Sequence, residues 1–151
     1  MNFGGTSAAS KVEEFGIVTK SEIDSLKTKA ETLFFADNYE AAIPVLIELS
    51  KKANWIANVI SLSNDPYHNA TPDEIYHMQF ARYKPYIALA YEYAKKRDIA
   101  LAMQGECLLK TGDKMGAIPV LLKALSLMNC SNVIWWGRTR KNLLSIIEVR
   151  L

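Results

Sequence analysis

Cysteine and glycine are both scarce in this chain of 151 residues, which contains two cysteines and seven glycines. Two cysteines cannot build the disulfide framework of a small secreted domain, and so few glycines argue against a protein made of strands and tight turns. No stretch approaches the roughly 18 apolar residues of a membrane-spanning helix, and the start of the chain lacks the basic and apolar segments of a secretory signal. We therefore expect a cytoplasmic protein without a membrane partner.

An excess of charge of one sign is lacking as well. The chain has 18 basic and 16 acidic residues, which gives a formal net charge of +2. Such a balance provides no electrostatic footprint for a polyanion, and it argues against a nucleic-acid partner. Hydrophobic residues make up 50% of the chain, as in ordinary globular proteins with a packed core.

Catalytic and metal-binding motifs are also missing. The residues that would hold a metal ion are His68, His77, Cys107 and Cys130, but their separations along the chain match no zinc pattern. The chain has no glycine-rich phosphate loop, no nucleophile elbow and no paired metalloprotease histidines. We therefore predict no enzyme activity, no metal and no cofactor. Cys107 falls on a helical packing surface and is expected to lie in the core.

Apolar residues recur at helical spacing through most of the chain, and no segment alternates as a strand would. Residues 1–20 show no such period and are expected to be a flexible tail before a helical domain at 21–151. Ser21 is the expected N-cap of the first helix. Pro85 interrupts the pattern of residues 72–97, which leaves open one kinked helix or two. The first helix is expected to end before Asp37 and Asn38. Further helices are expected at about 39–62, 98–111 and 114–128, and a last helix is expected to begin near residue 133.

The pentapeptide AIPVL occurs twice, at Ala42–Leu46 and at Ala117–Leu121. The shift that superposes the two pentapeptides also aligns two apolar patterns and two turn signals, so each copy is predicted to be a helix, a tight turn and a second helix. Small residues on the facing sides would let the two helices of each pair approach closely. These small residues are Ala30 and Ala42 in the first copy, and Gly105 and Ala117 in the second.

Both copies contain a proline, Pro44 or Pro119, where the helical pattern continues. If Asn38 and Asp113 are the N-caps, each proline lies near the sixth helical position and removes one backbone hydrogen bond. We expect each proline to bend its helix and to face away from the partner helix. The alternative is that the prolines are tolerated without a structural role.

Both copies resemble the tetratricopeptide repeat, a helix–turn–helix unit of about 34 residues. The matching residues are Leu26, Ala30, Leu33, Asn38, Tyr39, Ala42 and Leu46 in the first copy, and Leu101, Gly105, Leu108, Gly112, Asp113, Ala117, Leu121 and Ala124 in the second. The family's proline after the second helix is replaced by Asn54 and Asn129, and the segment between the copies fits only as a degenerate repeat. The resemblance implies an all-α fold of antiparallel helix pairs, stacked as a short right-handed solenoid with a C-terminal capping helix.

The resemblance also implies a function. Proteins of this family are non-enzymatic scaffolds or adaptors that bind a protein or peptide on a concave face formed by the first helix of each pair. Phe34 and Phe35 are surplus to the repeat's core positions, and aromatic residues dominate binding hot spots. The groove residues expected on this basis are Lys27, Glu31, Phe34, Phe35, Tyr83, Glu106 and Lys110.

An alternative function rests on the segment WWGRTRK at residues 135–141, whose tryptophans and basic residues could stack on bases and hold phosphates of RNA. The simpler interpretation is a closing helix that buries Ile134, Leu143 or Leu144, and Ile147 against the last repeat. The apolar C-terminal helix also leaves self-association open.

Overall fold

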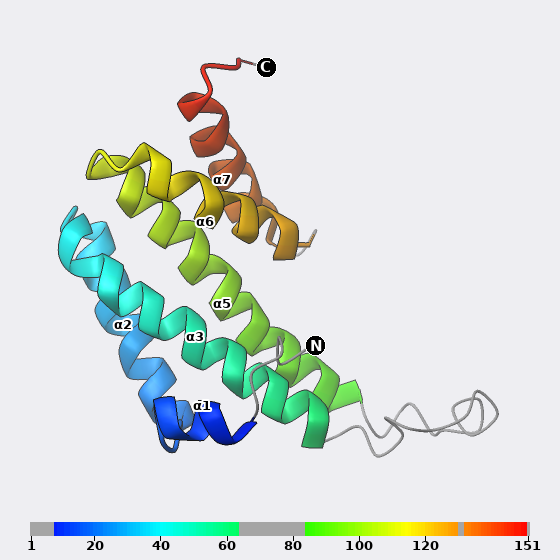
Figure 1. Cartoon of the computed structure of the whole chain (residues 1–151). Coiled ribbons are helices and arrows are strands. Elements are labelled where there is room, and N and C mark those ends of the chain that lie inside the picture. Colours follow the sequence, from blue (N-terminus) through cyan, green and yellow to red (C-terminus); the bar gives the residue numbers. More distant parts are fainter. Residues whose placement is uncertain (1–7, 64–83, 130–131, 151) are drawn as a thin grey trace.

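The computed structural model describes residues 8–63, 84–129 and 132–150, and these contain helices and no strand. The helices are α1 (Ala8–Phe15), α2 (Lys20–Phe35), α3 (Tyr39–Ser63), α5 (Lys84–Lys110), α6 (Lys114–Leu127) and α7 (Val133–Ile146) (Figure 1). The expectation of an all-α fold is confirmed for the described residues. None of the described helices is long and apolar enough to cross a membrane.

The two longest helices, α3 and α5, form the centre of the fold and pack against each other more extensively than any other pair. They run antiparallel, with α2 packed on α3, and with α6 and α7 at the other end of α5 (Figure 1). Most of the buried apolar side chains form one cluster that joins α2, α3 and α5. A smaller cluster joins α5 to α6 through Leu101, Ala102 and Ala124.

The course of α5 corrects one expected boundary. A break between two helices was expected near Arg97 and Asp98, but α5 is continuous through both residues. The run of charged residues there contains no glycine or proline that would end a helix. Asp98 is buried and accepts a hydrogen bond from Arg97 Nε at 2.8 Å. Pro85 is the second residue of α5, in the first turn, where its missing N–H has no helical partner to lose.

The start of the chain also differs from expectation. Helix α1 lies within the segment 1–20 that was expected to be a tail, and residues 1–7 lie outside the described part. The N-cap of α2 is Thr19, whose Oγ1 accepts a hydrogen bond from the Glu22 backbone N–H at 3.2 Å. The expected cap, Ser21, is therefore the second residue of the helix. Both residues can cap a helix, and the backbone bonds select the earlier one.

The turns of the two repeats are built in the same way, bond for bond. In the first turn the N–H groups of Asp37 and Asn38 donate to Phe34 O at 3.1 Å and Leu33 O at 2.9 Å. In the second turn the aligned residues do the same, with 3.2 and 2.9 Å, from Gly112 to Leu109 O and from Asp113 to Leu108 O. Asp37 and Gly112 both have a positive φ, of 59° and 90°. This is the Schellman arrangement that ends a helix, and it supports the repeat alignment.

The small residues of the repeat lie where the helices of each pair meet. Ala30, Ala42 and Ala117 are fully buried, and Gly105 is buried too. A Cβ atom on Gly105 would come within 2.5 Å of Leu121 Cδ2, so a larger residue would push α5 and α6 apart. The expected burial of these four residues is confirmed.

The two prolines lie inside α3 and α6, each as the sixth residue, and both are exposed. Their expected position on the outer face is confirmed. Asp113 is the N-cap of α6 and accepts a hydrogen bond from the Gly116 N–H at 2.8 Å. The bend of the helix at each proline stays a prediction.

Candidate functional site

A groove of about 310 Å³ lies between α2 and α5, and we name it the α2–α5 groove. Its floor is apolar and consists of Ala30 from α2, Leu49 from α3, and Ala100 and Met103 from α5. These four side chains are between 0% and 3% exposed. The two alanines keep the floor low, because a larger residue at either position would fill the space. Trp135 of α7 also lines the groove.

The rim of the groove is polar and charged. Lys27 and Glu31, one turn apart on α2, form an ion pair of 2.8 Å. On the α5 side the rim consists of Glu92, Lys95 and Lys96. Three lysines face two glutamates around the groove, so the rim carries a small positive excess. A polar rim around an apolar floor is the usual anatomy of a protein-binding site.

Phe35 is the most exposed aromatic wall of this groove. Its side chain is 66% exposed, although its ring packs edge-on against Phe34 at 5.2 Å between centroids. Phe34 lies behind it as a fixed support. Phe35 is therefore held in place and still open to a ligand, which is what a hot-spot anchor requires.

Three of the seven expected groove residues thus meet at one site, namely Lys27, Glu31 and Phe35. Phe34 is only 2% exposed, and the expectation that it faces a ligand is corrected. Its ring packs edge-on against Tyr39 at 5.9 Å and against Trp135 at 6.1 Å. The side chain of Trp135, from the last helix of the chain, covers it, which the repeat pattern of the first helix pair could not predict.

Glu106 is also withdrawn from the groove. It is 2% exposed, and its carboxylate accepts hydrogen bonds from Arg138 Nε at 2.7 Å, Arg138 Nη2 at 2.5 Å and Asn142 Nδ2 at 2.7 Å. Burial pushes the pKa of Glu106 up, but the hydrogen bonds and charge of Arg138 and the Asn142 amide outweigh it, and the net pKa is lowered. Glu106 therefore docks α7 onto α5. Lys110 is exposed and does not line the groove, and Tyr83 lies outside the described residues.

The groove contains residues that the sequence analysis did not assign to it, above all Lys96, Ile99 and Met103. Their spacing of three and four residues places them on one stripe of a helix. The helix break expected near Asp98 separated Lys96 from Ile99 and Met103, which both lay within the helix expected at 98–111.

The C-terminal segment forms helix α7, which packs on α5 and α6, but it buries a different face from the one expected. Ile134 is 81% exposed and Ile147 is 54% exposed, which corrects their expected burial. The buried residue of α7 is Thr139, which is 1% exposed. Arg138 and Asn142, on either side of it in the sequence, both donate hydrogen bonds to Glu106 of α5. We attribute this orientation of α7 about its axis to the ion pair between Arg138 and Glu106. Leaving a buried carboxylate unpaired costs more free energy than leaving an isoleucine exposed to solvent.

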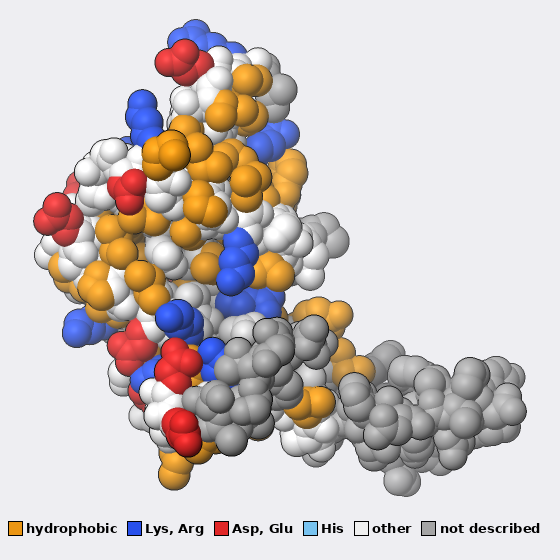
Figure 2. All heavy atoms as spheres, in the orientation of Figure 1, with side chains coloured by type: hydrophobic (Ala, Val, Ile, Leu, Met, Phe, Trp, Pro, Cys, Tyr) orange, Lys and Arg blue, Asp and Glu red, His pale blue; other side chains and the backbone are white. Residues whose placement is uncertain are grey.

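This rotation leaves apolar surface open. Figure 2 shows hydrophobic side chains gathered over the upper part of the molecule, where Figure 1 places α6 and α7. Met115, Leu122 and Ile134 are among the exposed apolar side chains of these helices. Self-association through this surface stays a prediction.

The basic and aromatic segment at 135–141 is partly engaged within the fold. Arg138 lies 5.4 Å from the Phe34 ring centroid and 5.1 Å from that of Trp135. Trp136 and Arg140 form a separate, more exposed pair at 5.1 Å. An RNA would therefore meet only Trp136, Arg140 and Lys141 of this segment without displacing internal contacts.

The described residues contain no group of three or more His, Cys, Asp or Glu side chains that could hold a metal ion. His68, His77 and Cys130 lie outside the described part. Cys107 is fully buried, as expected, and burial raises the pKa of its thiol to about 12. A thiol with so high a pKa is almost entirely protonated near neutral pH.

Comparisons of the chain with protein-family models, with curated proteins and with solved structures found no match. The resemblance to the tetratricopeptide repeat therefore rests on the matching residues of the two copies.

Proposed function

We propose that this chain is a non-enzymatic interaction module that binds a segment of another protein in the α2–α5 groove. The observation that carries the proposal is the combination of a held but exposed Phe35 with an apolar floor of buried side chains. The groove volume, about 310 Å³, lies at the small end of ligand pockets, and it suits one or two anchor side chains rather than a whole small molecule.

The architecture around the groove supports the same function. Two helix pairs with matching turns support a short tetratricopeptide-like solenoid, and in that family the first helix of each pair forms the concave face that binds ligands. Helices α2 and α5, which line the groove, are the first helices of the two pairs. The three lysines and two glutamates of the rim favour a partner segment with an apolar anchor and neighbouring acidic residues.

The test begins with a peptide library displayed on phage and selected on the wild-type chain. The affinity of the selected peptide is then measured for Phe35→Ala and for the control Tyr91→Ala. Tyr91 is an aromatic residue of similar exposure, 63% against 66%, that does not line the groove. Loss of a hot-spot aromatic should weaken binding by about 2 kcal/mol, roughly 30-fold, and the control should bind as the wild type does.

The methyl group of Met103 provides a second readout, because this side chain lies on the groove floor and is 2% exposed. Its NMR signal should shift when the peptide binds and should remain unshifted in the presence of a scrambled peptide. A peptide that binds both variants equally and leaves the Met103 methyl signal in place would show that the binding face lies elsewhere.

A further inference from the structure

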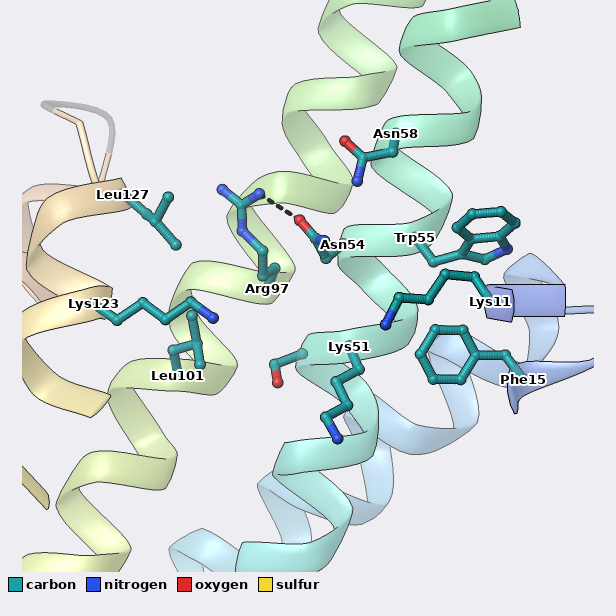
Figure 3. A pocket seen from close by; sticks show the side chains of 11 residues that line it. Lys11, Phe15, Lys51, Asn54, Trp55, Asn58, Arg97, Leu101, Lys123 and Leu127 are labelled. Carbon is teal, nitrogen blue, oxygen red and sulfur yellow. Dashed lines mark hydrogen bonds between the residues drawn. The ribbon is translucent and has the colours of Figure 1, made fainter. Parts of the chain in front are cut away.

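A second cavity, of about 510 Å³, lies on the opposite side of the helix layer, and we name it the α3 pocket. Residues of α1, α3, α5 and α6 line it (Figure 3). It shares no lining residue with the α2–α5 groove. Its volume falls within the range of small-molecule sites.

All the charged side chains that line the α3 pocket are basic. Lys11, Lys51, Arg97 and Lys123 line it, and no acidic side chain does. Lys11 pairs with Glu14 at 3.2 Å, and Arg97 pairs with Asp98 at 2.8 Å. Within the described part of the chain, Lys51 and Lys123 form no ion pair.

Arg97 is held in position for a ligand by its neighbours. Its Nη1 donates to Asn54 Oδ1 at 2.8 Å (Figure 3). Its Nε donates to Asp98 Oδ1 at 2.8 Å. These contacts fix the plane of the guanidinium and use two of its five N–H donors. A guanidinium fixed in this way binds phosphate or carboxylate oxygens at little entropic cost.

Asn58 is the independent sign of a ligand. It lines the α3 pocket one turn after Asn54, and its side chain is 3% exposed. Its Oδ1 is buried and has no hydrogen-bond partner among the described residues. A buried acceptor without a donor has given up its hydrogen bonds to water without a replacement, which costs free energy. A hydroxyl or N–H group of a bound molecule would supply the missing hydrogen bond.

We propose that the α3 pocket binds a small phosphate ester that also carries hydroxyl groups. Lys51 and Lys123, which form no ion pair with any described residue, and the remaining N–H donors of Arg97 match a group with nearly two negative charges better than a single carboxylate. The ligand's hydroxyl groups supply the donor that Asn58 Oδ1 lacks. Trp55 and Phe15 line the same pocket and offer an apolar surface to the body of the ligand.

The test is an NMR titration of the whole chain with three probes: adenosine monophosphate, adenosine and inorganic phosphate. Binding of adenosine monophosphate is expected to saturate during the titration. The NMR signals of the Asn54 and Asn58 side-chain amides and of the Trp55 indole N–H are expected to shift. Adenosine is expected to bind more weakly, since it lacks the charged group. Inorganic phosphate is expected to shift the amide signals of the same pocket at higher concentration.

The variant Lys51→Gln with Lys123→Gln should weaken the binding of adenosine monophosphate by about 10-fold or more, because it removes two charged donors. The matched control is Lys29→Gln with Lys114→Gln, which removes the same charge from exposed positions outside the pocket. Equal weakening in both double variants would mean non-specific attraction and would overturn the proposal. Absence of saturable binding by either phosphate probe would overturn it as well.

Asn58→Leu separates a binding role from a structural one. If Asn58 is retained for a ligand, the variant melts at the same temperature as the wild type or higher, because the unpaired acceptor is gone, and binding of adenosine monophosphate falls. A lower melting temperature together with unchanged affinity would assign Asn58 to the fold alone and refute its role in the pocket.

Discussion

Replacing Arg138 by alanine tests how α7 is attached to the rest of the fold. Arg138 supplies two of the three hydrogen bonds to the buried Glu106 carboxylate, and Asn142 supplies the third. In Arg138→Ala, the carboxylate would stay buried with one amide as its partner. The variant should therefore unfold more easily, and the loss should depend on pH in a way that identifies Glu106 as the cause.

The size of the loss follows from the exposure of the two partners. Breaking a buried ion pair by removing one partner costs about 3–5 kcal/mol. Glu106 is 3% exposed at its side chain, but Arg138 is 46% exposed, so water already screens part of the interaction. We expect a loss of about 2 kcal/mol in the free energy of unfolding at neutral pH. For a chain of this size that corresponds to a melting temperature lower by about 4–8 °C.

The pH dependence should reverse in this variant. In the wild type the pKa of Glu106 is lowered, so its contribution is fully present above the unfolded pKa and is lost as the pH falls through the folded value. Without Arg138, burial becomes the main influence and raises the pKa of Glu106. The variant then gains stability as acid protonates the buried carboxyl. The difference between the two proteins should be largest at about pH 7 and should shrink toward about pH 4.5.

Urea unfolding at these two pH values measures the difference. Arg140→Ala is the matched control, since Arg140 lies on the same helix and also stacks on a tryptophan at 5.1 Å. Its loss should change stability by no more than about 0.5 kcal/mol. If Arg138→Ala is as stable as Arg140→Ala, or if its loss is the same at both pH values, the ion pair does not hold α7 in place.

Three glycine substitutions and one alanine substitution test the repeat in thermal unfolding. Gly112→Ala should lose about 1 kcal/mol, because φ is 90° there, whereas Gly137→Ala should gain up to about 1 kcal/mol, because Gly137 lies inside α7 with free space around it. The same sign for both would refute the conformational argument. Gly105→Ala should cost about 1–3 kcal/mol through its contact with Leu121, and an unchanged melting temperature would mean that α5 and α6 are not closely packed. Ala117→Leu should overpack the same helix pair and lower the free energy of unfolding by about 1–3 kcal/mol. An unchanged melting temperature would contradict the alignment of the two copies.

The helix pairs were predictable from the sequence because their determinants are local. A turn signal at Asp37 and at Gly112 ends the first helix of each pair, and both residues adopt the left-handed conformation that the Schellman turn needs. Small residues at fixed offsets from these turns mark the contact between the helices. Since the whole unit occurs twice in the chain, two independent copies of the same local rules supported each other.

The rest depended on contacts between distant parts of the chain. The burial of Phe34 is completed by Trp135, and the orientation of α7 is set by the pair of Glu106 and Arg138, which are 32 positions apart. Apolar periodicity favoured Ile134 as a buried residue, yet Thr139 is buried and Ile134 is exposed. A hydrophobic pattern predicts the buried face of a helix from the apolar side chains of that helix alone. It does not take into account a buried charge on another helix that requires a hydrogen-bonded partner.

The two candidate sites can be tested independently because α5 separates them. Lys95, Ile99 and Met103 face the α2–α5 groove, whereas Arg97 and Leu101 face the α3 pocket. Positions two residues apart on an α-helix point about 200° away from each other, so neighbouring residues of α5 serve opposite sides of the layer. Phe35→Ala should therefore leave the binding of adenosine monophosphate unchanged, and the Lys51→Gln, Lys123→Gln variant should leave peptide binding unchanged. If either variant alters both affinities, the sites are coupled through α5 itself, since no lining side chain belongs to both.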